Sequence, residues 1–314
     1  MHFLIEQFIH LMQNFKNKQN RNFMKTFIGI FLIILIFSFS NACNRNNNAK
    51  EVSLENNKTT SSIKASDSLE EVKSKNLNNI PEGLQKLLLA YPDFLDSADE
   101  NNLYWNDGTK MIYDDGIENK DFETLLNDPD LEDQMSMEYV KGDAYEIPPD
   151  INFDPGRVRY EPFFLKMYGS SSGEVRGNLV SISWLPNNQK ISITYVNGVD
   201  EKLQAVANEL DELSSDLQKY VKKLGGTFNW RVISGTNRLS MHSFGNAIDI
   251  NVDYSNYWKW EKPGSDGVYQ YKNKIPMEIV EIFEKHGFIW GGKWYHYDTM
   301  HFEYRPELLV ELEK

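Results

Sequence analysis

The chain has 314 residues, of which 40% are hydrophobic and 13% aromatic, so it can fill the core of one domain and still carry extensions. Its formal net charge of -13 at pH 7 argues against a nucleic-acid partner and against electrostatic binding to an anionic membrane surface. Only one cysteine is present, Cys43, which excludes an intrachain disulfide.

The first 43 residues have the pattern of an export leader rather than of a folded segment. Met24 and Lys25 precede an apolar run over residues 27–39, and Ser-Asn-Ala then places a lipoprotein cleavage site directly before Cys43. A run of about 13 apolar residues is too short to favour a membrane-spanning helix. We therefore predict translation from Met24, export, and a lipid on Cys43 that anchors the chain to a membrane. An uncleaved N-terminal anchor is the alternative, and it also leaves the rest of the chain outside the cytoplasm.

Residues 44–79 are rich in Asn, Lys, Ser and Glu and contain almost no aromatic side chain. Such a segment cannot bury enough apolar surface to fold, so we predict a disordered tether. After it, we expect an N-terminal elaboration over residues 80–200. This part is expected to pack on a C-terminal domain over residues 201–314, which contains the candidate catalytic motifs.

Helical and strand signals are both present in the elaboration. Clustered leucines followed by Pro92 predict a short helix that ends near Tyr91. Apolar and aromatic runs between turn residues predict strands at 104–105, 111–113, 163–168, 179–185 and 190–196. The last two strands are expected to form a hairpin through Pro186.

Acidic residues are concentrated between positions 114 and 133 of this region. A calcium-binding loop would need alternating carboxylates, a glycine and a closing glutamate at fixed spacing, and that pattern is missing. We therefore expect solvated loop carboxylates rather than a cation site.

The C-terminal domain is expected to combine helices with short strands. Apolar residues at helical spacing predict a helix over 200–224 that ends at Gly225, and Pro276 predicts the start of a second helix that runs to His286. Strands are expected over 228–234, 247–252 and 300–304. The aromatic, turn-rich segment 254–271 is expected either to line a groove for substrate or to pack as core or rim.

Two polar motifs in this domain supply the residue types that hold a catalytic metal ion. His242 and Asp249 lie seven residues apart, and His301 follows about fifty residues later. Alternation along the strands puts Asp249 and His301 on polar faces, opposite the apolar side chains. Two histidines and one carboxylate leave one position of a tetrahedral zinc ion open, as a catalytic zinc requires.

The motif Ser-x-His-x-x-Gly-x-Ala-x-Asp over residues 240–249, with Asp-x-x-His-x-Glu over 298–303, resembles the zinc D-alanyl-D-alanine carboxypeptidase family. Relatives in that family include vancomycin-resistance dipeptidases and carboxypeptidases and phage L-alanyl-D-glutamate endopeptidases. The resemblance extends from about Gly226 to Tyr304. It implies an α+β fold of the LAS or hedgehog metallopeptidase type, in which helices flank a small antiparallel sheet that carries the zinc site. It also implies that His242, Asp249 and His301 bind zinc (Zn2+).

The same resemblance gives further residues a role. Asp298, three residues before the last ligand, matches the general base, and His296, five residues before it, is the alternative base or a hydrogen-bond donor in the transition state. Arg238 matches the arginine that polarises the scissile carbonyl. Ser240 is expected to hydrogen-bond the substrate or a ligand, and Glu303 to support a ligand from behind.

The expected function is zinc-dependent hydrolysis of peptidoglycan stem peptides by a D-alanyl-D-alanine carboxypeptidase, with L-alanyl-D-glutamate endopeptidase as the alternative. A module that holds zinc and binds wall peptides without cutting them is the alternative from another class. Such a module should lack the base and the arginine, and this chain has both Asp298 and Arg238. The expected partners are the wall peptide and, through the lipid on Cys43, a membrane, and we expect a monomer.

Overall fold

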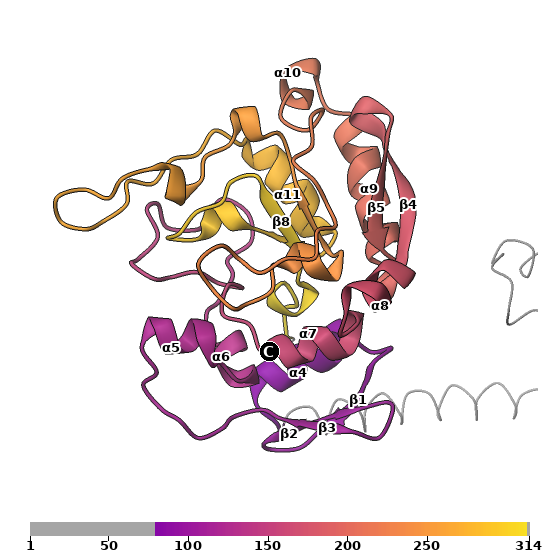
Figure 1. The fold of residues 1–314 in the computed structure, drawn as a ribbon, viewed down its shortest axis with the longest axis vertical. Coiled ribbons are helices and arrows are strands. Elements are labelled where there is room, and N and C mark those ends of the chain that lie inside the picture. The colour runs from indigo at the N-terminus through magenta and orange to yellow at the C-terminus, as the bar shows by residue number, and fades with distance from the viewer. Residues whose placement is uncertain (1–78, 313–314) are drawn as a thin grey trace, which may run out of the picture. The chain divides into compact units, whose positions relative to one another are not determined.

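The computed structural model describes residues 79–312 of the chain (Figure 1). These residues belong to one compact unit. The predicted leader with Cys43, and all of the predicted tether except Asn79, lie outside the described residues. Within the described part, no helix is both long and apolar enough to cross a membrane.

The first elements, purple in Figure 1, are a helix, a small sheet and two short helices. Helix α4 (Glu82–Ala90) ends before Pro92, as predicted, and buries Leu84 and Leu87. An antiparallel sheet in the order β1-β2-β3 follows, and it contains both predicted strands. Its strands are β1 (Leu95–Ala98), β2 (Asn102–Trp105) and β3 (Lys110–Ile112). The carboxylates of Asp121 and Asp130 cap the next two helices, α5 (Phe122–Asn127) and α6 (Leu131–Met135).

The predicted strand over 163–168 is wrong, because the structure has helix α7 (Glu161–Tyr168) there. Pro162 lies in the first turn, where a missing N–H costs nothing. Phe163, Phe164, Met167 and Tyr168 are buried, and their spacing is that of one helix face. Helix α8 (Ser172–Gly177) follows, capped by Ser171.

The predicted hairpin of strands β4 (Leu179–Trp184) and β5 (Gln189–Thr194) is confirmed. Helix α9 (Val199–Asp211) packs against it and buries Leu203, Val206 and Leu210. The helix predicted over 200–224 is too long, since α9 ends at Asp211 and only a short helix, α10 (Ser215–Gln218), comes after it. Consecutive serines at 214 and 215 explain the break, because serine favours helix ends over helix interiors.

The strand predicted over 228–234 is also wrong. This segment is a loop with one isolated bridge, between Val232 and Leu239. Its backbone groups bond instead to the loop that follows: Arg231 N–H donates to the Ser243 hydroxyl, and Ser240 N–H donates to the Arg231 carbonyl. These bonds satisfy the backbone without a sheet partner.

A three-stranded antiparallel sheet in the order β6-β8-β7 lies in the C-terminal half. Its strands are β6 (Ala247–Asp249), β7 (Phe288–Trp290) and β8 (His301–Tyr304). Helix α11 (Met277–Lys285) begins directly after Pro276, as predicted, and Phe283 stacks on Phe302 of β8 with ring centroids 3.8 Å apart. Helices and small antiparallel sheets together confirm the predicted α+β class.

Candidate metal centre

Three polar side chains meet at the end of the β6-β8-β7 sheet. Asp249 on β6 and His301 on β8 are direct cross-strand partners, so the sheet register places their side chains together. His242 comes from a 3-10 helical turn over Met241–Phe244, just before β6. One nitrogen or oxygen atom from each of the three lies within 4.8 Å of the other two.

Gly245 allows the chain to pass from the His242 turn into β6. Its φ of +66° lies in the left-handed region, which disfavours residues with a side chain. A Cβ at this position would also come within 2.7 Å of Leu179. Both the backbone conformation and the close packing therefore favour glycine at position 245.

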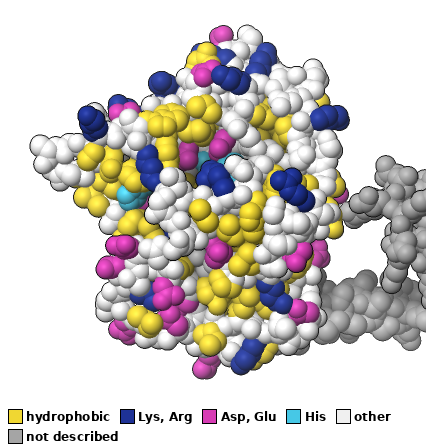
Figure 2. Space-filling model, in the orientation of Figure 1, with side chains coloured by type: hydrophobic (Ala, Val, Ile, Leu, Met, Phe, Trp, Pro, Cys, Tyr) yellow, Lys and Arg dark blue, Asp and Glu magenta, His cyan; other side chains and the backbone are white. Residues whose placement is uncertain are grey.

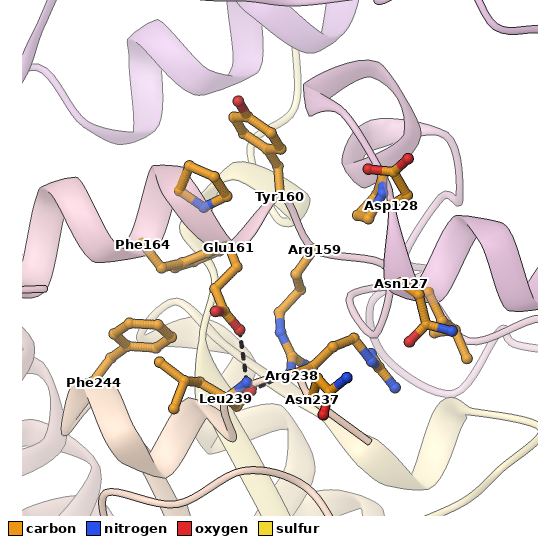
Figure 3. A pocket seen from close by; sticks show the side chains of 13 residues that line it. Asn127, Asp128, Arg159, Tyr160, Glu161, Phe164, Asn237, Arg238, Leu239 and Phe244 are labelled. Atoms are coloured by element: carbon orange, nitrogen blue, oxygen red, sulfur yellow. Dashed lines mark hydrogen bonds between the residues drawn. The ribbon is translucent and has the colours of Figure 1, made fainter. Parts of the chain in front are cut away.

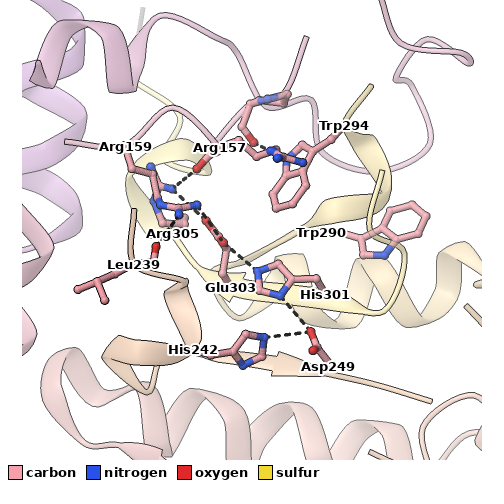
Figure 4. Close-up of polar contacts among 12 residues, drawn as sticks. Arg157, Arg159, Leu239, His242, Asp249, Trp290, Trp294, His301, Glu303 and Arg305 are labelled. Atoms are coloured by element: carbon pink, nitrogen blue, oxygen red, sulfur yellow. Dashed lines mark hydrogen bonds and ion pairs between the residues drawn. The ribbon is translucent and has the colours of Figure 1, made fainter. Parts of the chain in front are cut away.

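Each imidazole faces an oxygen acceptor at both ring nitrogens. Figure 4 shows His301 between Asp249 and Glu303, with His242 on the other side of Asp249. In His242, Nδ1 donates to the Thr227 carbonyl oxygen and Nε2 lies 3.1 Å from Asp249 Oδ1. In His301, Nδ1 lies 3.0 Å from the same Oδ1, and Nε2 lies 2.9 Å from Glu303 Oε2. A neutral imidazole carries only one N–H, so it can satisfy only one of its two acceptors. The arrangement therefore suits a cation between the two rings and Asp249.

The donor set fits a divalent metal ion by chemistry and by spacing. Ligand atoms of a tetrahedral zinc ion lie about 3.3 Å apart, and the nitrogen-to-oxygen distances here are 3.0 and 3.1 Å. The ring nitrogens that face away from Asp249 are His242 Nδ1, which contacts the Thr227 carbonyl, and His301 Nε2, which contacts Glu303. Histidines that bind a metal usually have such a partner on the second nitrogen. Although burial raises it, the charges and hydrogen bonds of His242 and His301 lower the pKa of Asp249 well below its usual range. The ligands are thus oriented and the carboxylate is ionised.

Glu303 connects His301 to a buried chain of charges. Its Oε1 pairs with Arg305 at 3.0 Å, and its Oε2 lies 3.9 Å from Arg159. Arg305 in turn pairs with Glu307. Burial opposes ionisation of Glu303, but the hydrogen bond from His301 and the charges of Arg159 and Arg305 lower its pKa to about 2. Glu303 therefore remains an anion that can hold and polarise the His301 ring.

Asp298 lies in the turn just before β8, and its backbone carbonyl accepts a hydrogen bond from His301 N–H. Its Oδ1 is buried and has no hydrogen-bond partner among the described residues. Burial and the negative charge of Asp249 raise the pKa of Asp298 to about 6, while His301 and Arg157 act in the opposite direction. A buried carboxylate with an unused oxygen and a pKa near neutrality is suited to proton transfer.

Unlike Asp298, His296 has a carboxylate partner, Asp154. Its Nδ1 lies 2.6 Å from Asp154 Oδ2, and its backbone N–H donates to Asp154 Oδ1. The ring stacks on Phe122, with centroids 5.4 Å apart, and meets the edge of Trp258 at 4.6 Å. His296 is therefore oriented by a buried carboxylate, and its Nε2 has no hydrogen-bond partner within residues 79–312.

The other two predicted residues lie on the loop before His242. Arg238 donates through Nη1 to the Arg157 carbonyl at 3.3 Å, and its Nε is buried without a partner in the described part. Ser240 is buried and begins the turn that carries His242, through backbone bonds to Arg231 and Ser243. The Ser240 side chain caps no helix.

The aromatic segment 254–271 packs beside the centre rather than forming a separate feature. Tyr257 forms a backbone bridge with Asp298, and Trp258 N–H donates to the Tyr297 carbonyl. Trp260 stays 56% exposed. The expected packing is therefore confirmed for Tyr257 and Trp258, while the lining of a substrate groove stays a prediction. Hydrophobic and charged side chains lie intermixed on the face of the molecule that Figure 2 shows.

Sequence reasoning missed the residues that reach the centre from the elaboration. Asp154, Arg157 and Arg159 precede α7, yet they contact His296, Trp294 and Glu303 respectively. The only local signal was two arginines following an aspartate in an acidic region, and nothing in that spacing connects them to positions 140 residues later. The incorrect strand prediction over 163–168 also gave no indication that the residues before α7 contact the C-terminal segment.

The acidic region 114–133 already contains a cation from the protein itself. Lys120 Nζ lies 2.6 Å from Asp133, 3.0 Å from Asp115 and 3.7 Å from Asp130. The lysine side chain is only 2% exposed. Its ammonium group takes the place that a calcium ion would need. The prediction of solvated carboxylates is wrong for Asp130 and Asp133, which are buried, and holds for Asp115, which is exposed.

Comparison with known proteins gives one match. Residues 234–304 match the family model described as D-alanyl-D-alanine carboxypeptidase. No curated protein and no solved structure matches the chain. The matched range includes Arg238, the three candidate metal ligands, Asp298 and Glu303, and it excludes Asp154, Arg157 and Arg159.

Proposed function

We propose that the protein is a zinc-dependent peptidase that hydrolyses peptidoglycan stem peptides, and the match of residues 234–304 to the D-alanyl-D-alanine carboxypeptidase family model supports this. The proposed reaction is removal of the terminal D-alanine. One observation carries the proposal: Asp249 and His301 are cross-strand partners with His242 beside them, and the buried Asp298 lies in the adjoining turn.

A zinc ion at His242, Asp249 and His301 would supply a Lewis acid that acidifies water and polarises the scissile carbonyl. Asp298 accepts the proton of the attacking water and returns it to the leaving amine nitrogen. Arg238 stabilises the negative charge that develops on the carbonyl oxygen. Glu303 holds the His301 ring in its orientation through the 2.9 Å contact to Nε2.

We also propose where the enzyme works. The leader pattern before Cys43 supports export and attachment to a membrane through a lipid. A tethered peptidase outside the cytoplasm has wall peptides within reach, which is consistent with the substrate class. Mass spectrometry of the mature protein tests this part, because a diacylglyceryl mass on Cys43 is expected and an unmodified N-terminus starting at Met1 would contradict it.

Incubation of purified muropeptides with the full-length protein tests the activity. Mass spectra are compared with and without chelator, and again after zinc is added back. Loss of one alanine is expected in the presence of zinc. Release of a stem peptide that begins at D-glutamate would establish the endopeptidase instead. Unchanged spectra with metal bound would favour the wall-peptide binding module.

A further inference from the structure

Tyr257 is held directly opposite Asp298 by backbone pairing. The two residues form an isolated antiparallel bridge. The residues on either side of the bridge hydrogen-bond across it at 3.0 and 2.9 Å, from Trp258 N–H to the Tyr297 carbonyl and from Thr299 N–H to the Asn256 carbonyl. In an antiparallel pair of this type the two facing residues exchange no backbone hydrogen bond, and their side chains lie close together on one face. The Tyr257 ring is therefore placed beside the Asp298 carboxylate.

The ring of Tyr257 is fixed, but its hydroxyl is not used. It packs edge-to-face against Trp258 and Trp260, with ring centroids 6.3 and 5.8 Å apart. The side chain is half-buried, and its hydroxyl has no hydrogen-bond partner within residues 79–312. A phenol that is oriented by packing and unpaired at its hydroxyl is a preorganised hydrogen-bond donor.

Charged groups of the candidate metal centre act on this hydroxyl. Burial and the charge of Asp298 raise the pKa of Tyr257, with a further contribution from the candidate ligand Asp249, while Arg157 and Arg231 act in the opposite direction. Because such interactions weaken with distance, the hydroxyl lies near both the proposed base and a candidate ligand. The phenol also keeps its proton at neutral pH, so it can donate a hydrogen bond.

Arg238 reaches the same region from a different part of the chain. It lines a cavity of about 320 Å³ whose wall comes from the α5–α6 connection, the first turn of α7 and the loop that carries Arg238 (Figure 3). Tyr257 and Asp298 do not line this cavity. The charge of Arg157 nevertheless acts on both Arg238 and Tyr257. The two donors therefore approach from separate elements, and Tyr257 does not duplicate Arg238.

We propose that Tyr257 is a further catalytic residue, whose hydroxyl donates a hydrogen bond to the oxygen that becomes negative when the scissile carbonyl is attacked. This inference rests on the proposed peptidase function and adds a residue to its mechanism. A neutral donor suits a position beside Asp298, because it stabilises the oxyanion without neutralising the base. A cationic side chain there would pair with Asp298 and lower its pKa, which would weaken it as a proton acceptor. The phenol keeps its proton throughout, so Asp298 remains the group that transfers one.

Tyr257→Phe removes the hydroxyl and keeps the ring, so the full-length variant should fold and retain its zinc. With muropeptides, kcat should fall by about 100-fold while KM changes by less than about threefold, because the donor acts on the transition state and not on the bound substrate. Tyr220→Phe is the matched control, since the Tyr220 ring packs on Tyr254 at 5.1 Å instead. A kcat for Tyr257→Phe equal to that of the control would overturn the proposal.

Affinity for a transition-state analogue gives a second readout, which does not depend on turnover. The probes are two phosphinate peptides, in which a tetrahedral anionic centre replaces either the D-alanyl-D-alanine or the L-alanyl-D-glutamate bond. Calorimetry on the zinc-loaded protein should show that Tyr257→Phe weakens binding of the tighter phosphinate by about 10- to 100-fold. Binding of the parent peptide, measured on Asp298→Asn to prevent cleavage, should change little. Equal weakening of both ligands would mean that Tyr257 acts by packing, and the proposal would be wrong.

The Asp298→Asn background also separates direct contact from action through the base. A loss of phosphinate affinity that persists in this background supports direct contact, whereas a loss that disappears there would overturn it. Phosphinate binding that depends on Tyr257 in a protein that cuts no peptide would support the residue, and the hydrolytic function would be what fails. Cleavage by the wild type with unchanged phosphinate affinity in Tyr257→Phe would leave the function standing and remove Tyr257. Absence of phosphinate binding by the zinc-loaded wild type would contradict both.

Discussion

The Tyr91 hydroxyl donates a 2.6 Å hydrogen bond to Glu307 Oε2, although 216 residues separate the two in the chain. Glu307 pairs with Arg305, Arg305 with Glu303 at 3.0 Å, and Glu303 with His301 at 2.9 Å. The three charged residues between Tyr91 and His301 are completely buried. The end of helix α4 is therefore connected to a candidate metal ligand by an uninterrupted series of polar contacts.

Tyr91→Phe should destabilise the protein by about 1–3 kcal/mol, because it removes the donor to a buried carboxylate oxygen. Urea unfolding followed by tryptophan fluorescence measures the change. Tyr104→Phe is the control, since the Tyr104 hydroxyl bonds Asp99 at an exposed position and should change stability by less than about 0.5 kcal/mol. Equal effects of the two substitutions would contradict a structural role for the buried series.

Local patterns explain why the candidate ligands could be grouped from the sequence. Period-two alternation along β6 and β8 put Asp249 and His301 on polar faces, and in the structure these two residues pair across the strands. His242 could be included because it lies a short turn away from β6. The alternation within each strand is local, and sequence patterns are informative over that range. The pairing of Asp249 with His301, 52 residues later, was instead implied by the family resemblance.

The contribution of the elaboration could not be predicted in the same way. Arg157 and Asp154 both reach His296, through contacts between residues 139 and 142 positions apart. The error at α7 has a related cause, since a short apolar and aromatic run fits a strand and a buried helix equally well. Its first-turn proline was the signal that favoured a helix.

Glu303→Gln should destabilise the metal-free protein in a pH-dependent manner. Glutamine cannot neutralise Arg305 and Arg159, and the carboxylate it replaces has a pKa of about 2 in the fold compared with an ordinary value of 4.5. The stabilisation from this carboxylate is complete above about pH 4.5 and is lost as the pH falls towards 2. Its size near neutral pH should be about 3 kcal/mol.

Thermal unfolding of wild type and Glu303→Gln, with chelator present, measures this difference across the acidic range. The two melting temperatures should converge as the pH falls. A difference in melting temperature between the two proteins that stays constant down to about pH 2 would mean that Glu303 acts by packing rather than by charge.

Lys120→Met should destabilise the protein by about 3–5 kcal/mol, because it leaves the carboxylates of Asp115, Asp130 and Asp133 facing one another without a cation. Chemical unfolding measures the loss. Lys223→Met is the matched control, since Lys223 pairs with Asp253 at the surface with both side chains more than half exposed. A loss no larger than that of the control would show that the cluster is solvated in solution.

Alanine at His242, Asp249 or His301 should lower the zinc content of the purified protein to a small fraction of the wild-type value. Each substitution removes one of three protein ligands, and the remaining two cannot hold the ion against dialysis. Inductively coupled plasma mass spectrometry gives the metal-to-protein ratio. Ser240→Ala serves as the control on the same loop and should keep its metal. Full zinc occupancy in any one alanine variant would remove that residue from the ligand set.

Asp298→Asn should lower kcat by about 10²–10⁴-fold while zinc content stays unchanged, because the amide cannot accept the proton of the attacking water. The base must be ionised to act, so kcat/KM should rise with pH through an acidic limb. In the metal-free fold the pKa of Asp298 is about 6, raised by burial and by the charge of Asp249. A bound cation offsets the Asp249 charge, so the limb should lie at or below about pH 6.

His296→Gln provides the comparison for the assignment of the base. His296 is bonded through Nδ1 to Asp154, so its loss should disturb the position of the Arg157 segment and lower kcat/KM by a smaller factor, about tenfold, with the acidic limb unchanged. Rate measurements across pH on both variants distinguish the two residues. If His296→Gln abolished the acidic limb while Asp298→Asn kept most of its turnover, the proton would be taken by His296 and the assignment of Asp298 would be wrong.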